Sequence, residues 1–136
     1  MSVYRSTEVF RASGLTIASS SNHIAASVTN AVSGRTGPID VSRISNGLLV
    51  VNCADAPTGT NPTLAVLIDV QDAFGNWVLV SNAAGISGSA IGSSGFTYGN
   101  ISSGYQLTDT ARIRWTLGGT GGPQFTNVSF SLYGRP

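Results

Sequence analysis

Charged residues are scarce in this sequence of 136 residues, where they make up only 10% of the chain. Soluble domains usually contain about 25%. The surface must therefore be polar mainly through serine, threonine, asparagine and glycine. Such a surface suits a chain that hides much of its exterior in an assembly, or that lies on an extracellular or virion surface. A poorly soluble protein of ordinary type is the alternative interpretation.

Lysine is absent, and all seven basic residues are arginine. Arginine forms bidentate contacts and is desolvated more easily than lysine, so its exclusive use favours buried interfaces, although codon bias explains it equally well. The formal net charge is only +1. This balance lacks the strongly basic footprint of a nucleic-acid-binding protein, and we expect no nucleic-acid partner.

Cysteine and histidine each occur once, as Cys53 and His23. A single cysteine excludes an internal disulfide and the usual zinc sites, and we expect Cys53 to be a small buried residue. His23 has no motif partner. Asp69 and Asp72 fit an outward strand position and a turn better than a glycosidase pair. We therefore predict no catalytic residues, no metal site and no cofactor, so the protein is not expected to be an enzyme.

No apolar run approaches the length of about 18 residues that a membrane-spanning helix requires. The first ten residues, MSVYRSTEVF, also lack the apolar core of a secretory signal. The sequence therefore predicts no membrane association, and it predicts synthesis in a cytoplasm.

Alternating and apolar runs separated by turn residues predict β-strands. Residues 48–54 form an apolar run, and residues 64–70 alternate between apolar positions and others. The sequence AFGN at 73–76 predicts a tight turn into a hairpin partner at 77–80. Near the end, residues 111–117 and 128–133 alternate around a glycine-rich segment, which predicts a terminal β-hairpin with a wide loop.

Together these patterns predict one all-β domain, an antiparallel β-sandwich or jelly-roll-like fold of about eight strands with an extended N-terminal arm. Residues 1–45 would form the arm and the first strands, and residues 46–136 the sandwich core. The inward positions of the alternating runs give a predicted core of Leu49, Val66, Ile68, Trp77, Ile113, Trp115 and Phe130.

Three segments resemble small structural proteins of tailed bacteriophages. They are GLLVVNCA at 47–54, GTNPTL at 59–64 leading into VLIDVQDAFGNWVLV, and RIRWTLGGTGGPQFTNVSFSLYG at 112–134. The resemblance covers about residues 46–136. Residues 1–45 do not match, the GGTGGP loop is longer than in the family, and residues 83–95 are unusually rich in glycine and serine.

The resemblance implies a capsid decoration (cement) protein on the outside of the expanded head, where it bridges and stabilises major capsid protein subunits. Self-association, for example as a homotrimer, would fit this role. We expect the arm to add a strand to a neighbouring subunit, with a predicted contact set of Tyr4, Arg5, Phe10, Arg11 and Arg35. The alternatives are a neck, tail or fibre component and, from another class, a carbohydrate-binding module that uses exposed tyrosines and residues 83–95.

Overall fold

The computed structural model describes residues 5–20, 28–87, 95–101 and 106–136, which contain strands and no helix. No helix able to cross a membrane is found in these ranges. The strands are β1 (Thr7–Ile17), β2 (Ile39–Asp40), β3 (Asn46–Cys53), β4 (Thr58–Gln71), β5 (Trp77–Ser87), β6 (Gly95–Ile101) and β7 (Thr110–Arg135). The predicted strands at 48–54 and 64–70 are thus present as β3 and β4. β5 extends beyond the predicted hairpin partner at 77–80 and ends at Ser87, and residues 88–94 lie outside the described ranges.

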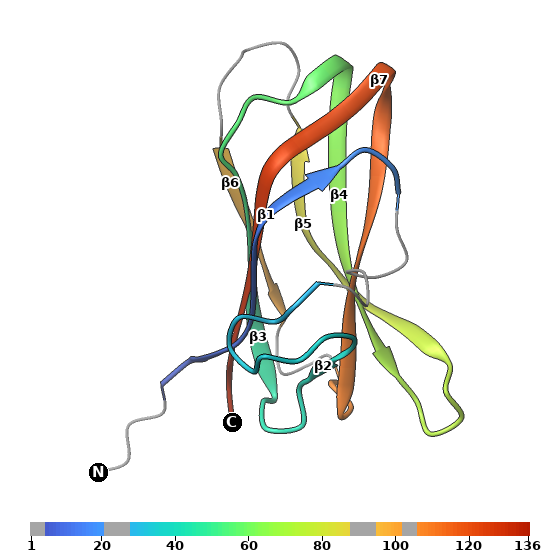
Figure 1. Ribbon diagram of the computed structural model, residues 1–136. Helices are drawn as coiled ribbons and strands as arrows, with labels where there is room; N and C mark the ends of the chain where they lie inside the picture. The colour runs from blue at the N-terminus through green and yellow to red at the C-terminus, as the bar shows by residue number, and fades with distance from the viewer. Residues whose placement is uncertain (1–4, 21–27, 88–94, 102–105) are drawn as a thin grey trace.

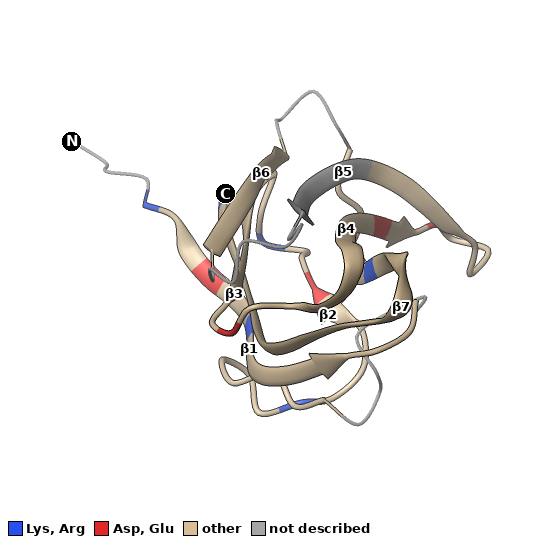
Figure 2. Ribbon diagram, turned by 90° about the horizontal axis from the view of Figure 1, so that it is seen from above, with Lys and Arg blue, Asp and Glu red and all other residues tan. Residues whose placement is uncertain are grey.

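The strands form two antiparallel sheets that share β7. Sheet A has the order β6–β3–β7–β1, and sheet B has the order β5–β4–β7–β2. Figure 2 shows the two sheets curling around a common interior. The predicted all-β, jelly-roll-like architecture is therefore confirmed.

The predicted terminal hairpin is wrong, because the two halves of β7 pair in different sheets. Residues 111–118 pair with β4, whereas residues 125–134 pair with β1 and β3. In Figure 1 the orange half of β7 rises on one side of the molecule and the red half returns on the other. Alternation predicted both strand segments correctly. It contains no information on which strands become their neighbours.

Glycines make the corner of β7 possible. Gly119 has a φ of 114°, and a Cβ atom there would lie 3.0 Å from backbone atoms of residues 60–62. Gly59 has a φ of 99°, and its Cβ would lie 2.8 Å from the Cα atom of Pro123. The corner of β7 therefore packs backbone against backbone on the start of β4, which a larger residue at either position would prevent.

The predicted core is confirmed for six of its seven residues. Leu49, Val66, Ile68, Ile113, Trp115 and Phe130 are all buried. Trp115 and Phe130 join the two halves of β7 across the interior, with ring centroids 5.8 Å apart and planes at 18°. The indole Nε1 of Trp115 also donates a hydrogen bond to the Ser19 carbonyl at 3.0 Å.

The core prediction is wrong for Trp77, which is half-buried and lies outside the core cluster. It faces Gln71 across the β4–β5 pair, whereas the inward positions of β4 are those of Ile68 and Val70. This register places Trp77 on the outer face of sheet B. The alternation of a short strand does not by itself tell which of its two faces turns inward.

Most of the predicted N-terminal arm belongs to the domain's own sheet. β1 pairs with the second half of β7, and it contributes Phe10, Ala12 and Ile17 to the core. The expectation that the arm adds a strand to a neighbouring subunit is thus corrected for residues 7–17, because the strand partner of this segment lies in the same chain.

Candidate interaction surfaces

The predicted contact residues lie in different environments. Tyr4 is outside the described residues. Arg5, Arg11 and Arg35 are exposed, as a contact role requires. Phe10 is only 1% exposed, and its assignment as a contact residue is wrong because the alternation of β1 turns its side chain into the core.

Hydrogen bonds to Asn30 connect the two segments that carry Arg11 and Arg35. Its side chain accepts a hydrogen bond from the Arg11 backbone N–H at 3.2 Å and donates one to the Val9 carbonyl at 2.9 Å. The Asn30 backbone N–H donates to the Arg35 carbonyl at 2.8 Å. The Arg11 side chain forms an ion pair with Glu8 at 3.4 Å, and Glu8 also accepts a hydrogen bond from Ser131.

An open groove of about 840 Å³ lies beside this network, and we call it the basal groove. Its charged lining consists of Glu8, Arg35, Asp40 and Arg43, which is balanced in sign. Hydrogen bonds from the Ser42 hydroxyl and backbone N–H hold the pKa of Asp40 below its usual value. The groove therefore has polar groups but no excess charge that would select a ligand of one sign.

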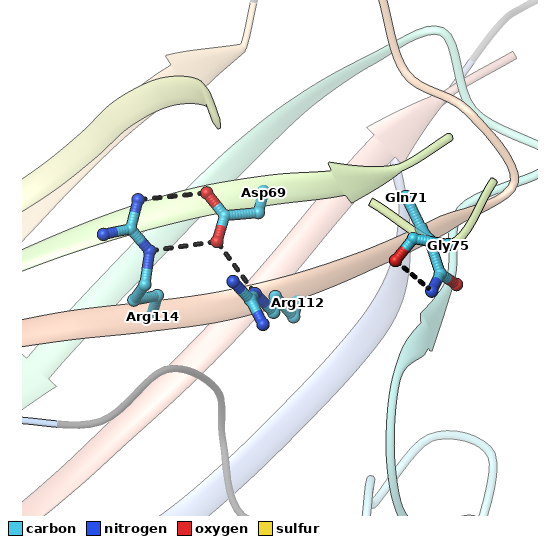
Figure 3. Close-up of polar contacts among 5 residues, drawn as sticks. All are labelled: Asp69, Gln71, Gly75, Arg112 and Arg114. Atoms are coloured by element: carbon cyan, nitrogen blue, oxygen red, sulfur yellow. Dashed lines mark hydrogen bonds and ion pairs between the residues drawn. The ribbon is translucent and has the colours of Figure 1, made fainter. Parts of the chain in front are cut away.

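A charged cluster lies on the outer face of sheet B, where the sequence predicted only an exposed aspartate. Asp69 is 2% exposed. Its Oδ2 accepts hydrogen bonds from Arg112 Nε at 2.8 Å and Arg114 Nε at 2.9 Å, and its Oδ1 accepts one from Arg114 Nη2 at 3.1 Å (Figure 3). The guanidinium of Arg112 also lies 4.6 Å from the ring centroid of Trp77.

Two arginines around one carboxylate set the electrostatics of this cluster. Burial raises the pKa of Asp69, but hydrogen bonds from Arg114 and Arg112 outweigh burial and leave the pKa below its usual value. Asp69 in turn raises the pKa of Arg114. The cluster therefore carries one net positive charge. The available sequence signal was the Arg-x-Arg spacing on one strand face, opposite an outward aspartate on the neighbouring strand.

The turn between β4 and β5 is held by several hydrogen bonds and presents an exposed phenylalanine. Asp72 is the turn residue that the sequence predicted, and it accepts hydrogen bonds from the backbone N–H groups of Phe74 and Asn76, both at 2.8 Å. Gln71 Nε2 donates to the Gly75 carbonyl at 3.2 Å, across the same turn (Figure 3). The Phe74 side chain is 90% exposed. The AFGN motif predicted the turn, but it contains no signal for the outward position of its phenylalanine.

A second exposed apolar region lies on the outer face of sheet A. Phe96 and Tyr98, two residues apart on β6, are 70% and 59% exposed. Val50 lies directly across from Tyr98 and is half-buried. Sheet A therefore presents two aromatic rings to solvent, close to its β6 edge.

The described residues contain no group of three or more side chains suited to hold a metal ion. Cys53 is buried as expected, and its thiol donates a hydrogen bond to the Asp55 carbonyl at 3.0 Å. Burial raises the pKa of the Cys53 thiol, which disfavours the reactive thiolate. His23 lies outside the described ranges.

No protein-family model and no curated protein matches the sequence. Among solved structures the chain is similar to Eiger TNF from S. frugiperda, with a TM-score of 0.53 and 10% sequence identity. The similarity covers 92% of this chain and 90% of the other. At this identity it shows the jelly-roll fold alone.

Proposed function

We propose that this chain is a bacteriophage capsid decoration protein, located on the outside of the virion and bound to the major capsid protein. The resemblance of its three segments to small phage structural proteins supports this role. Those segments correspond to β3, to β4 with the start of β5, and to β7. They thus supply the central strands of both sheets and the β4–β5 hairpin.

The observation that carries the proposal is the presence of two separate exposed apolar regions on a domain with few charges. One comprises Phe74 and Leu79 on the β4–β5 hairpin, and the other comprises Phe96 and Tyr98 on β6. Apolar patches exposed on a soluble domain often mark interaction sites. Two such regions allow one copy to contact two neighbours at once, as a bridging protein must.

The proposed mechanism is thermodynamic rather than chemical. A protein that binds the expanded lattice more tightly than the unexpanded one stabilises the expanded state by the difference in binding free energy. Each contact can be modest, because trimerisation or repeated attachment along the shell raises the effective affinity. In a homotrimer, Phe96 and Tyr98 would be available for contacts between copies.

Cosedimentation with expanded, undecorated capsids of the encoding phage tests this proposal. We expect occupancy to saturate at a fixed ratio to the major capsid protein, and binding to unexpanded capsids to be weaker. Absence of binding to expanded capsids would overturn the decoration role and favour a neck or tail location. Equal binding to both lattices would overturn the stabilising mechanism.

A further inference from the structure

The outer face of sheet B joins the exposed turn to the arginine cluster. Asp69 lies directly across from Arg112 on one side and from Leu79 on the other, and Gln71 lies across from Trp77. Figure 3 shows the Asp69 cluster next to the Gln71–Gly75 contact of the turn. We call Phe74 on the turn, together with Trp77, Leu79, Arg112 and Arg114 on the outer face of sheet B, the hairpin surface.

Phe74 has the properties of an anchor residue. Its ring is almost fully exposed, so its apolar area is available for burial by a partner. The turn that presents it is already ordered by the hydrogen bonds to Asp72 and Gly75. Little backbone entropy is then lost on binding, and a preorganised aromatic side chain can contribute a large part of the binding energy.

The arginine cluster adds a preference for negative charge. One arginine would neutralise Asp69, and the second leaves an excess of one positive charge. Among the described residues, Arg112 forms its side-chain hydrogen bond to Asp69 through Nε alone. Its terminal nitrogens belong to a guanidinium that is held over Trp77, and a guanidinium fixed in this way can bind a carboxylate with its outer edge.

The basal groove is the competing surface, and it fits a specific partner less well. Its charged side chains are two acidic and two basic residues, and its largest exposed hydrophobic residue is Val32. The hairpin surface combines an exposed aromatic ring, an exposed leucine and half-buried arginines, which is the composition of interface centres.

We infer that the hairpin surface is where the chain docks on the major capsid protein, and that it takes a site in which an apolar pocket lies beside a carboxylate. Phe74 fills the pocket, and Arg112 with Arg114 binds the carboxylate. This inference rests on the proposed decoration function and specifies which face of the domain meets the capsid.

Binding isotherms of matched variants test the inference. Phe74→Ser and Arg112→Gln change the hairpin surface, whereas Val32→Ser and Arg43→Gln make comparable changes at the basal groove. Occupancy on expanded capsids is measured at low and high salt, and thermal melting shows that each variant is folded. We expect Phe74→Ser to weaken binding at least about tenfold at both salt concentrations. Arg112→Gln should weaken binding mainly at low salt, because salt screens the charge interaction. The two basal variants should bind within about twofold of the wild type.

The outcomes separate the inference from the function on which it rests. If the wild type does not bind capsids, the decoration function fails and the inference fails with it. If the wild type binds and both hairpin variants bind as tightly as the wild type, the function stands and the inference is overturned. The same holds if only the basal variants lose affinity. A photo-crosslinking phenylalanine analogue at position 74 gives a second readout that does not depend on Arg112→Gln remaining folded. It should crosslink to the major capsid protein, and a crosslink only to another copy of this chain would contradict the inference.

Discussion

The two halves of β7 have similar inward sides and different outward sides. Inward, Ile113 and Trp115 in the first half match Val128 and Phe130 in the second, and all four are buried. Outward, the first half carries Arg112 and Arg114, which bind Asp69. The outward residues of the second half are serines and a tyrosine, Ser129, Ser131 and Tyr133.

This difference shows that the inward and outward positions of one strand meet independent requirements. The inward positions need only volume and apolarity, which both halves supply. The outward positions decide what each sheet presents to other molecules, and here they give sheet B a positive cluster beside a projecting hairpin. One strand therefore stabilises both sheets while contributing to two chemically different surfaces.

Removal of the Phe130 side chain, at a buried inward position of β7, should lower the stability of the fold most. Phe130→Ala deletes a fully buried ring that stacks on Trp115, so it should lower the free energy of unfolding by about 3–5 kcal/mol. Urea denaturation measures this loss. Ser129→Ala, one residue away on the outward side, should change stability by less than about 0.5 kcal/mol. Similar losses for both variants would contradict the division between inward and outward positions.

The corner between the halves should be the next most sensitive element. Gly119→Ala combines a left-handed backbone with contacts of 3.0 Å to backbone atoms, and we expect a loss of about 2–3 kcal/mol. Gly122→Ala is the matched control, because Gly122 has a φ of 69° but nothing within 4 Å of the added Cβ. It should cost about 1 kcal/mol. Equal melting temperatures for the two variants would show that the corner does not require close backbone packing.

The outward cluster of the first half should contribute a smaller, pH-dependent stabilisation. Because the folded pKa of Asp69 is lowered, its contribution is fully present above the unfolded value of about 3.9 and is lost as the pH falls through the folded pKa. Asp69→Asn should lower the free energy of unfolding by about 2 kcal/mol at pH 7. The difference from the wild type should shrink in denaturation experiments below about pH 4. A difference that stayed constant with pH would exclude an electrostatic origin.

The outward ion pair on β1, the strand that pairs with the second half, should matter least. Arg11→Ala removes an ion pair to Glu8 in which the arginine side chain is 53% exposed, so we expect a change below about 0.5 kcal/mol that disappears at high salt. Thermal melting at two salt concentrations checks this value. A loss as large as that of Asp69→Asn would mean that the two outer faces are electrostatically alike.

The sequence predicted the fold class and most of the core, because period-two alternation directly reports burial. It misassigned Trp77 and the partners of β7, since both depend on register between strands that lie far apart in the chain. The arm prediction failed for a related reason. The alternation of β1 is equally compatible with a free extended segment, and the local sequence does not reveal its pairing with the second half of β7.

The interaction surfaces were harder to predict than the core. Arg112, Arg114 and Asp69 were visible as outward residues, but their convergence follows from the β4–β7 pairing, which no local pattern encodes. Phe74 was placed in a turn correctly, yet its exposure depends on how far the hairpin projects. Arg5, Arg11 and Arg35 were correctly expected to be exposed, because arginine usually is.

The shared position of β7 has a consequence for synthesis on the ribosome. β4 pairs with its first half, whereas β1 and β3 pair with its second half. Sheet B therefore lacks β7 until residues up to about 124 have emerged, and sheet A lacks it until residues up to about 135 have emerged. Before that point the nascent chain exposes the apolar faces of β1, β3 and β4 without a complete core. Formation of the domain is therefore governed by long loop closures and should be slow, as in other sandwiches rich in non-local pairings. Chaperone binding during translation should be strongest in the interval before β7 appears.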